Sequence, residues 1–278
     1  MSGTLFLVAT PIGNLKDMTE RALETLRSVS LIAAEDTRNS IKLLNHFEIK
    51  TPMTAYHEFN KYEKADTLVQ VLLKGDDVAL ITDAGTPGIS DPGEVLVSKC
   101  YENDIPVTSL PGCCALINAL ILSGLPTRRF SFEAFLPADK KERKAILNEM
   151  KSDTRTLILY EAPHHLKKTL NELSEALGNR RISLCRELTK KFEDIRRTTI
   201  EDAISYYEIN EPKGEFVLVI EGKNPSELLE EERSSWEELS IEEHVSLYVE
   251  QGVDKKTAMK KVAENRGISK RDVYKELL

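Results

Sequence analysis

The chain has 278 residues, of which 41% are hydrophobic and 30% are charged, and its formal net charge is −8. This length accommodates two ordinary domains, and the composition is that of a globular protein rather than a disordered one. No apolar run approaches the roughly 18–20 residues that span a bilayer, so we expect no membrane partner. The acidic total also disfavours indiscriminate binding to nucleic acid.

Short apolar runs alternate with amphipathic stretches through the first half of the chain. The runs cover residues 4–10, 31–36, 78–83 and 106–110, and the stretches cover residues 19–28, 61–73 and 92–101. Near-continuous apolar strands separated by helices are typical of βαβ units with a parallel sheet covered on both faces. An apolar helix at 113–122 and a Gly-Leu-Pro break follow. We therefore predict an α/β lobe over residues 1–123.

A second set of apolar runs follows, with fewer helices between them. The runs cover residues 130–136, 156–162, 181–188 and 215–221, and the helical stretches cover residues 140–150, 164–177 and 200–207. This spacing predicts a second, mixed α/β lobe over residues 124–223. Two α/β lobes joined by a short link form a cleft, which is where ligands usually bind.

The last part of the chain differs in charge and in pattern. Residues 226–253 carry nine acidic residues and one basic residue, whereas residues 254–278 carry eight basic and four acidic residues. We interpret the acidic residues 223–239 as a solvated linker or a poorly packed helix. Ser240 and Glu243 then form a capping-box pattern, and Gly252 and Gly267 separate three short helices. We predict a helix-turn-helix-like module over residues 240–278, with a dimerisation or capping bundle as the alternative.

Three loops that contain glycine come directly after predicted strands, at residues 10–14, 83–93 and 110–115. In an open α/β sheet, ligands bind at the carboxyl ends of the strands, and glycine lets the main chain approach a ligand closely. No dinucleotide fingerprint or P-loop occurs, and residues 82–98 contain no lysine. These loops therefore predict a site for a small ligand of little net charge, held mainly by backbone groups.

The four cysteines are Cys100, Cys113, Cys114 and Cys185, and no two of them have C-x-x-C spacing. The histidines form no H-E-x-x-H motif either. We interpret the cysteines as small, mostly buried hydrophobic side chains in a reducing compartment, and we predict a cytoplasmic protein without a metal site.

Six segments together resemble the tetrapyrrole methylase-like (class III) methyltransferases: PIGNLKDMTERA, EDTR, DAGTPGISDPG, LPGCCALINAL, YEAPHH and KGEFVLVIEG. The resemblance covers residues 3–222 in order and is closest to the branch that methylates a cytidine 2′-oxygen in small-subunit (16S) ribosomal RNA. It implies two α/β lobes with S-adenosylmethionine in the cleft between them. It also implies a homodimer whose partner is ribosomal RNA or the small ribosomal subunit. The C-terminal helices resemble the helix-turn-helix appended in that branch.

The resemblance further implies which residues surround the methyl donor. Many members have two glycines at the start of the second loop, where this chain has Ala84 followed by Gly85. Carried over by motif, the cofactor-binding residues are Pro11, Ile12, Asp83, Ala84, Gly85, Thr86, Ile89, Cys114, Ala115, Tyr160, Glu161, Thr189 and Phe216.

A ribose hydroxyl is a poor nucleophile unless a base accepts its proton during attack. The candidates near the mouth of the cleft are Glu35, Asp36 and His57, with Arg38 and Lys16 able to position a phosphate. Two alternatives stay open here. Asp36 and Arg38 could instead cap the next helix and pair with each other, and His57 could be structural.

Binding of ribosomal RNA requires basic side chains on the surface, although the net charge of the chain is negative. Three groups lie in or near the second lobe: Arg128 and Arg129; Lys140, Lys141, Arg143 and Lys144; Lys190, Lys191, Arg196 and Arg197. Each group by itself is also consistent with a solvated surface. Two other functions remain open: methylation of a tetrapyrrole or a protein side chain, and a non-catalytic role in RNA binding or ribosome assembly.

Overall fold

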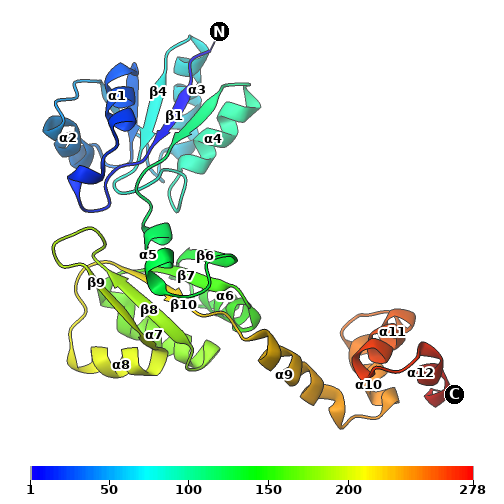
Figure 1. The fold of residues 1–278 in the computed structure, drawn as a ribbon. Coiled ribbons are helices and arrows are strands. Elements are labelled where there is room, and N and C mark those ends of the chain that lie inside the picture. The colour runs from blue at the N-terminus through cyan, green and yellow to red at the C-terminus, as the bar shows by residue number, and fades with distance from the viewer. Residues whose placement is uncertain (1, 278) are drawn as a thin grey trace. The chain divides into compact units, whose positions relative to one another are not determined.

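The structure is a computed structural model that describes residues 2–277. The chain divides into two compact units. The first comprises the residues up to 150 together with 155–221, and the second comprises 151–154 together with the chain from 222 onward. The first unit contains two β-sheets with helices around them, and the second unit is helical (Figure 1). The α/β fold class with a helical C-terminal part is confirmed, whereas the predicted lobe boundaries stay predictions.

The first sheet consists of five parallel strands in the order β3-β2-β4-β1-β5. Its strands are β1 (Leu5–Val8), β2 (Leu31–Ala34), β3 (Met53–Ala55), β4 (Val78–Ile81) and β5 (Val107–Leu110). Four of them lie within the predicted apolar runs. The prediction missed β3, because three residues are too few to show a periodic pattern.

Four helices cover the two faces of this sheet. The helices α1 (Glu20–Ser28) and α2 (Thr37–His46) pack on one face, and α3 (Lys61–Leu73) and α4 (Gly93–Glu102) pack on the other. Along β4, Val78 and Leu80 join the core beneath α3 and α4, whereas Ala79 and Ile81 join the core beneath α1 and α2. Successive side chains of a strand point to opposite faces, so a strand covered on both sides is apolar throughout.

The second sheet has the order β6-β7-β10-β8-β9, and only the pair β6 and β7 is parallel. Its strands are β6 (Phe130–Phe135), β7 (Thr156–Glu161), β8 (Arg181–Arg186), β9 (Asp194–Thr199) and β10 (Phe216–Ile220). The expected mixed sheet is therefore present. The prediction missed β9, because this edge strand has a largely polar sequence.

The second sheet also has helices on both faces. The helix α5 (Ala115–Ser123) packs on one face, where Leu116, Ala119 and Leu120 join a core with side chains of β7, β8 and β10. The helices α6 (Lys140–Ser152), α7 (Pro163–Leu177) and α8 (Ile200–Ile209) cover the other face. The helix α5 ends at Gly124 in the left-handed conformation, with φ 74° and ψ 10°, which glycine adopts without steric cost.

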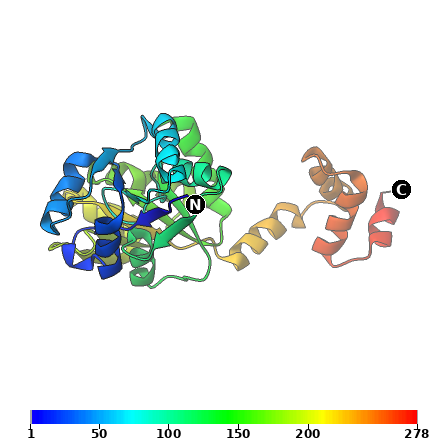
Figure 2. The same ribbon diagram turned by 90° about the horizontal axis from the view of Figure 1, so that it is seen from above.

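The second unit contains α9 (Pro225–Glu237), α10 (Ile241–Glu250), α11 (Lys255–Arg266) and α12 (Lys270–Glu276), drawn from gold to red in Figures 1 and 2. The capping box of Ser240 and Glu243 is present as predicted, and the acidic segment forms α9. Val245, Val262 and Val273 belong to a small core shared by the last three helices. Within residues 2–277, none of the helices is long and apolar enough to span a membrane.

Candidate functional site

A cleft of about 460 Å³ lies where loops at the carboxyl ends of the first sheet's strands face the second sheet. Its volume is within the range of small-molecule sites, roughly 300–1,000 Å³. The first sheet contributes Ile12, Glu35, Thr82, Asp83, Ala84, Gly85, Thr86, Ile89, Ser90 and Asp91. Residues from β5 onward complete the lining: Cys114, Ala115, Phe135, Tyr160, Glu161, Ala162, Cys185, Glu187, Leu188, Lys190, Glu215, Phe216 and Val217.

Hydrogen bonds tie the three glycine-containing loops to one another. The Thr10 N–H donates to the Gly85 carbonyl at 2.8 Å, and the Gly85 N–H donates to the Thr10 carbonyl at 3.0 Å. The Thr86 hydroxyl donates to the Cys113 carbonyl at 2.9 Å. Gly85 has φ +88°, a conformation that glycine adopts without strain. The loops therefore form one connected rim whose backbone is held in place before a ligand arrives.

The Asp91 carboxylate fixes the rest of the second loop. It accepts hydrogen bonds from the N–H groups of Gly88, Ile89 and Gly93 at distances between 2.8 and 3.1 Å. A side chain used in this way organises a turn, as aspartate often does. The Ile89 side chain lines the cleft next to this turn and is 40% exposed.

The second sheet contributes an aromatic and apolar wall. Phe216 is buried in β10, and Tyr160 packs edge-on against Phe132 and Phe135, with ring centroids 4.9 and 5.6 Å apart. Burial raises the pKa of Tyr160 to about 12, so the phenol is neutral at physiological pH. This side of the cleft suits a flat, weakly charged group.

The structure brings nearly all of the predicted cofactor-binding residues together. All of them line the cleft except Pro11 and Thr189. The Thr189 hydroxyl oxygen is buried and has no hydrogen-bond partner among the described residues. The roles of these predicted residues in cofactor binding stay predictions.

A charged group at the second sheet was predicted only in part, because Lys190 was expected among the RNA-facing basic residues and Glu187 and Glu215 were not predicted. The Lys190 ammonium lies 2.9 Å from Glu187 and 2.8 Å from Glu215, and all three residues line the cleft. Glu187 and Lys190 follow β8, and Glu215 precedes β10. For Glu187 and Glu215 the sequence signal was this position beside predicted strands, and the antiparallel pairing of β8 with β10 that joins them to Lys190 could not be inferred.

Of the polar side chains predicted for catalysis, only Glu35 lines the cleft. Its Oε2 accepts a hydrogen bond from the Thr82 hydroxyl at 2.5 Å and a longer one from the Asp83 N–H at 3.4 Å. No described residue forms a hydrogen bond with its Oε1. Glu35 is thus held by one oxygen, and the other is available to a ligand.

Asp36 and Arg38 adopt the structural arrangement that the sequence had left open. Asp36 is the N-cap of α2, and its Oδ1 accepts a hydrogen bond from the Arg38 N–H at 2.8 Å. The Arg38 guanidinium also pairs with Asp36 Oδ2 at 2.8 Å, and neither residue is in the cleft lining. The hydrogen bonds from Arg38 lower the pKa of Asp36 to about 2, which makes this carboxylate a weak base. Arg38 itself stays largely exposed, with 88% of its side chain accessible.

His57 lies after β3, outside the cleft lining. Its backbone N–H donates to Asn60 at 2.8 Å, and its ring Nδ1 is buried without a hydrogen-bond partner among the described residues. The ring lies 6.2 Å from that of Phe59, which is 97% exposed. Nothing in this arrangement connects His57 to the cleft.

The basic groups predicted to meet RNA are partly engaged elsewhere. The Arg143 side chain is buried and paired with Glu172, so expecting it at an RNA surface was wrong. The Arg196 guanidinium lies over the ring of Tyr206, 3.6 Å from its centroid, and Arg197 donates to the Leu122 carbonyl. The Lys191 ammonium lies over the ring of Phe192, 5.7 Å from its centroid. The residues of these groups that remain exposed and without such contacts are Arg128, Arg129, Lys140, Lys141 and Lys144.

The part of the chain that the structure describes contains no group of three or more His, Cys, Asp or Glu side chains able to hold a metal ion. The cleft instead offers backbone groups, the free Oε1 of Glu35 and an apolar wall. This combination suits an organic ligand with both polar and flat apolar parts.

The family described as tetrapyrrole (corrin/porphyrin) methylases matches residues 4–204 of the chain. A protein of Halalkalibacterium halodurans named ribosomal RNA small subunit methyltransferase I is 49% identical over 272 residues, which is 98% of this chain and 93% of that protein. A protein of the same name from Synechocystis is 47% identical over 273 residues, covering 98% and 96%.

The fold is also similar to that of a solved structure. The crystal structure of diphthine synthase has a TM-score of 0.61 and 14% sequence identity, and the match covers 80% of this chain and 91% of that one. At this level of identity, the similarity concerns the fold alone.

Proposed function

Because this chain belongs to the tetrapyrrole (corrin/porphyrin) methylase family, we propose that it methylates the ribose 2′-oxygen of a cytidine in 16S ribosomal RNA, using S-adenosylmethionine. The observation that carries the proposal is the near-complete match to relatives whose names specify ribosomal RNA of the small subunit. Methyltransferases of this family use S-adenosylmethionine as the methyl donor.

The residues in the cleft suit this donor. Phe216, Val217 and Leu188 form an apolar surface for an adenine ring, and Glu161 can accept hydrogen bonds from polar groups of the adenosine. The helix α5 begins beside the cleft, and its N-cap, Cys114, makes no side-chain cap hydrogen bond. The first N–H groups of α5 are therefore free of a side-chain cap and can meet the carboxylate of the methionine part.

The bound donor supplies a methyl group that its sulfonium already activates for displacement. The protein has to hold the acceptor oxygen in line with that group, which by itself contributes a large rate factor. Glu35 is the residue that we propose to accept the proton of the ribose hydroxyl, at its free Oε1. The Thr82 hydroxyl and the Asp83 N–H keep its other oxygen in place.

The RNA is proposed to approach over the rim of the first sheet. Arg38 and Lys16 are exposed there, one after β2 and the other after β1, and each can bind a phosphate. Additional phosphate contacts are proposed for the exposed basic residues of the second sheet and for the basic helices α11 and α12. A dimerisation role for those helices remains the alternative.

We also propose that the protein acts in the cytoplasm as a homodimer. On α5, Ile117 and Ile121 are 43% and 64% exposed and lie one helical turn apart, which gives a second copy an apolar surface to contact. Sedimentation of the wild-type protein, compared with an Ile117→Glu and Ile121→Glu double variant, measures this part of the proposal.

Labelled S-adenosylmethionine, incubated with the protein and with 16S RNA either free or in small subunits, tests the function. We expect label on the 2′-oxygen of one cytidine, and we expect Glu35→Gln to lower the single-turnover rate about 10²–10⁴-fold. Asp36→Asn neutralises the adjacent carboxylate outside the cleft and should change the rate less than threefold. A larger loss of rate in Asp36→Asn than in Glu35→Gln would identify Asp36 as the residue that accepts the proton.

Two outcomes would replace the proposed function. Transfer of label to a tetrapyrrole or a protein, and not to RNA, would keep the donor and change the acceptor. Absence of donor binding in calorimetry would point to a non-catalytic role in RNA binding or ribosome assembly.

A further inference from the structure

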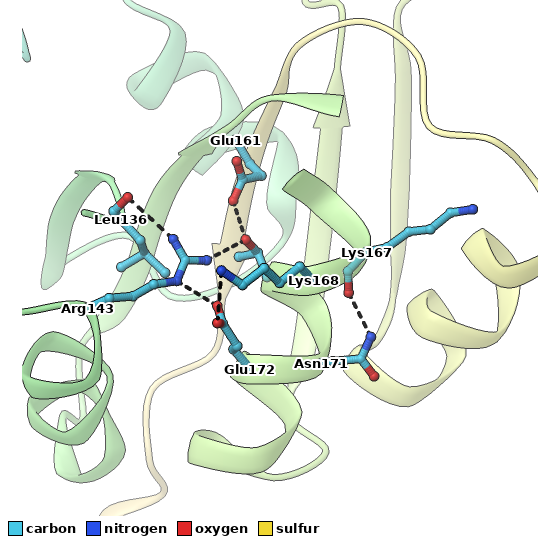
Figure 3. Close-up of polar contacts among 8 residues, drawn as sticks. Leu136, Arg143, Glu161, Lys167, Lys168, Asn171 and Glu172 are labelled. Atoms are coloured by element: carbon cyan, nitrogen blue, oxygen red, sulfur yellow. Dashed lines mark hydrogen bonds and ion pairs between the residues drawn. The ribbon is translucent and has the colours of Figure 1, made fainter. Parts of the chain in front are cut away.

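A buried charged cluster lies directly behind the cleft. Arg143 extends from α6 toward α7, which contributes Thr169 and Glu172, and Glu161 lies at the end of β7 (Figure 3). The residues Thr169, Glu161 and Arg143 are 0%, 5% and 9% exposed. Of this cluster, only Glu161 lines the cleft. The other members therefore cannot contact a ligand there directly.

Short contacts link the members in one line. The Arg143 Nε donates to Glu172 Oε2 at 2.6 Å, and its Nη2 donates to the Thr169 hydroxyl oxygen at 2.7 Å. The Thr169 hydroxyl in turn donates to Glu161 Oε2, and the Ala162 N–H donates to Glu161 Oε1 at 2.8 Å. Figure 3 shows the Arg143 guanidinium and the Glu161 carboxylate, and the hydrogen bonds of the Thr169 hydroxyl to both groups place it between them.

The chemistry of these groups fixes the direction of the hydrogen bonds. A guanidinium only donates, so the Thr169 oxygen must accept from Arg143, and the single hydroxyl proton is left to point at Glu161. Both oxygens of Glu161 then accept hydrogen bonds, as an ionised carboxylate does. A carboxylate has about four lone-pair positions, so about two remain for a ligand in the cleft.

The cluster also balances the charges that it buries. Glu172 has a second cation close by, because the Lys168 ammonium lies 3.6 Å from its Oε1. Glu161 has no ion-pair partner at its own side chain in the described part of the chain, and the nearest positive charge in the cluster reaches it only through Thr169. A buried carboxylate is costly unless it is hydrogen-bonded and compensated. The Thr169 hydroxyl supplies such a hydrogen bond to Glu161, and the Arg143 guanidinium lies directly behind that hydroxyl.

We propose that Arg143 is a positioning residue that acts through the Thr169 hydroxyl to hold the Glu161 carboxylate in one orientation at the cleft. In that orientation, Glu161 accepts hydrogen bonds from the donor groups of the adenosine part of S-adenosylmethionine, its ribose hydroxyls or its amino group. The inference rests on the proposed function for the identity of the ligand. It gives Arg143 and Thr169 a role in ligand binding although neither residue lines the cleft.

Titration calorimetry with S-adenosylhomocysteine tests the role of Thr169. Thr169→Val keeps the shape of the side chain and removes the hydroxyl, and we expect the Kd to rise about tenfold. Thr169→Ser retains the hydroxyl and should restore the wild-type Kd. Thr156→Val is the matched control, because Thr156 is also buried in the second lobe and donates to the Pro126 carbonyl, away from the cleft. It should lower the Tm and leave the Kd unchanged.

Arg143→Lys tests the guanidinium itself. Lysine keeps the charge but lacks the fork that reaches Glu172 and Thr169 together, so the Kd should rise for this variant too. A fall in Tm with an unchanged Kd, in either Arg143→Lys or Thr169→Val, would show that the cluster only clamps α6 to α7. That result would overturn the proposal.

A second ligand identifies which part of the donor Glu161 meets. The loss of affinity in Thr169→Val should persist with 5′-methylthioadenosine, which keeps the adenosine and lacks the amino-acid end. A loss seen only with S-adenosylhomocysteine would place Glu161 at the amino-acid end and refute the assignment. If wild-type protein binds the ligand but does not methylate RNA, the proposed function fails and this inference stands. If the wild-type protein binds neither ligand, both fail.

Discussion

Replacing Gly85 by valine is the sharpest test of the backbone in the cleft. Gly85 has φ +88°, and it exchanges two hydrogen bonds with Thr10 across the rim. A Cβ added there would lie 3.4 Å from Ile12 Cγ2 and 3.5 Å from the Cys113 carbonyl oxygen, which are ordinary contacts. Space is therefore available, and the conflict lies in the backbone conformation.

The expected magnitude follows from that conformation. A residue other than glycine at positive φ costs about 1–3 kcal/mol, and a β-branched side chain belongs at the upper end. If the loop relaxes in the free protein, a ligand has to restore the strained form, and the cost appears in binding. Because 1.4 kcal/mol corresponds to a factor of ten, we expect the Kd for S-adenosylhomocysteine to rise about tenfold to a hundredfold.

Calorimetry gives the Kd, and circular dichroism and thermal melting show whether the fold is retained. Gly178→Val is the matched control, because Gly178 also has positive φ, at +74°, and a Cβ there would meet nothing within 4 Å. It follows α7 and is not part of the cleft lining, so it should lose stability and keep its affinity. A Gly85→Val protein that binds within twofold of wild type would refute the reasoning and remove this loop from the site.

Three further predictions concern RNA binding and the ion pair of Asp36 with Arg38. Removing residues 240–278 should weaken binding of 16S RNA and flatten its dependence on salt, because phosphate contacts release counterions, and should leave the Kd for the donor unchanged; an unchanged salt slope would favour the dimerisation or capping role. Arg38→Ala should raise the RNA concentration needed for half-maximal rate without lowering the rate at saturation. Since Arg38 lowers the pKa of Asp36 from 3.8 to about 2, the ion pair contributes to stability above pH 3.8, and the contribution is lost as the pH falls through 2. The difference in Tm between Arg38→Ala and wild type should accordingly be constant from pH 5 to 8 and shrink toward pH 2.

Much of the fold could be read from local patterns. The strands β1, β2, β4 and β5 were visible because a strand buried on both faces is apolar throughout. The caps at Ser240 and Gly267 marked the helices of the second unit for an equally local reason, since a helix end must satisfy its own backbone groups. The short β3 and the polar β9 were missed, because their pairing with neighbours, and not their own composition, makes them strands.

The candidate site shows the same division more sharply. The loops at Gly85 and Cys114 were predictable, because each follows a buried strand and parallel strands end at one edge of a sheet. The sequence could not predict which of Glu35 and Asp36 enters the cleft, because both residues follow β2. The position at which α2 begins makes Asp36 its N-cap and leaves Glu35 to line the cleft.

Contacts between residues far apart in the sequence likewise determine which basic side chains are exposed and which are buried. Arg143 belongs to a run that resembles a solvated, RNA-facing surface, yet it is buried against Thr169 and Glu172. Those residues lie 26 and 29 positions further along the chain. Composition and spacing determine which segments become strands, helices and turns, because those are properties of neighbouring residues. The pairing of Arg143 depends instead on the packing of α6 on α7. Only the tertiary structure therefore decides which charged side chains are paired and which remain free for a ligand.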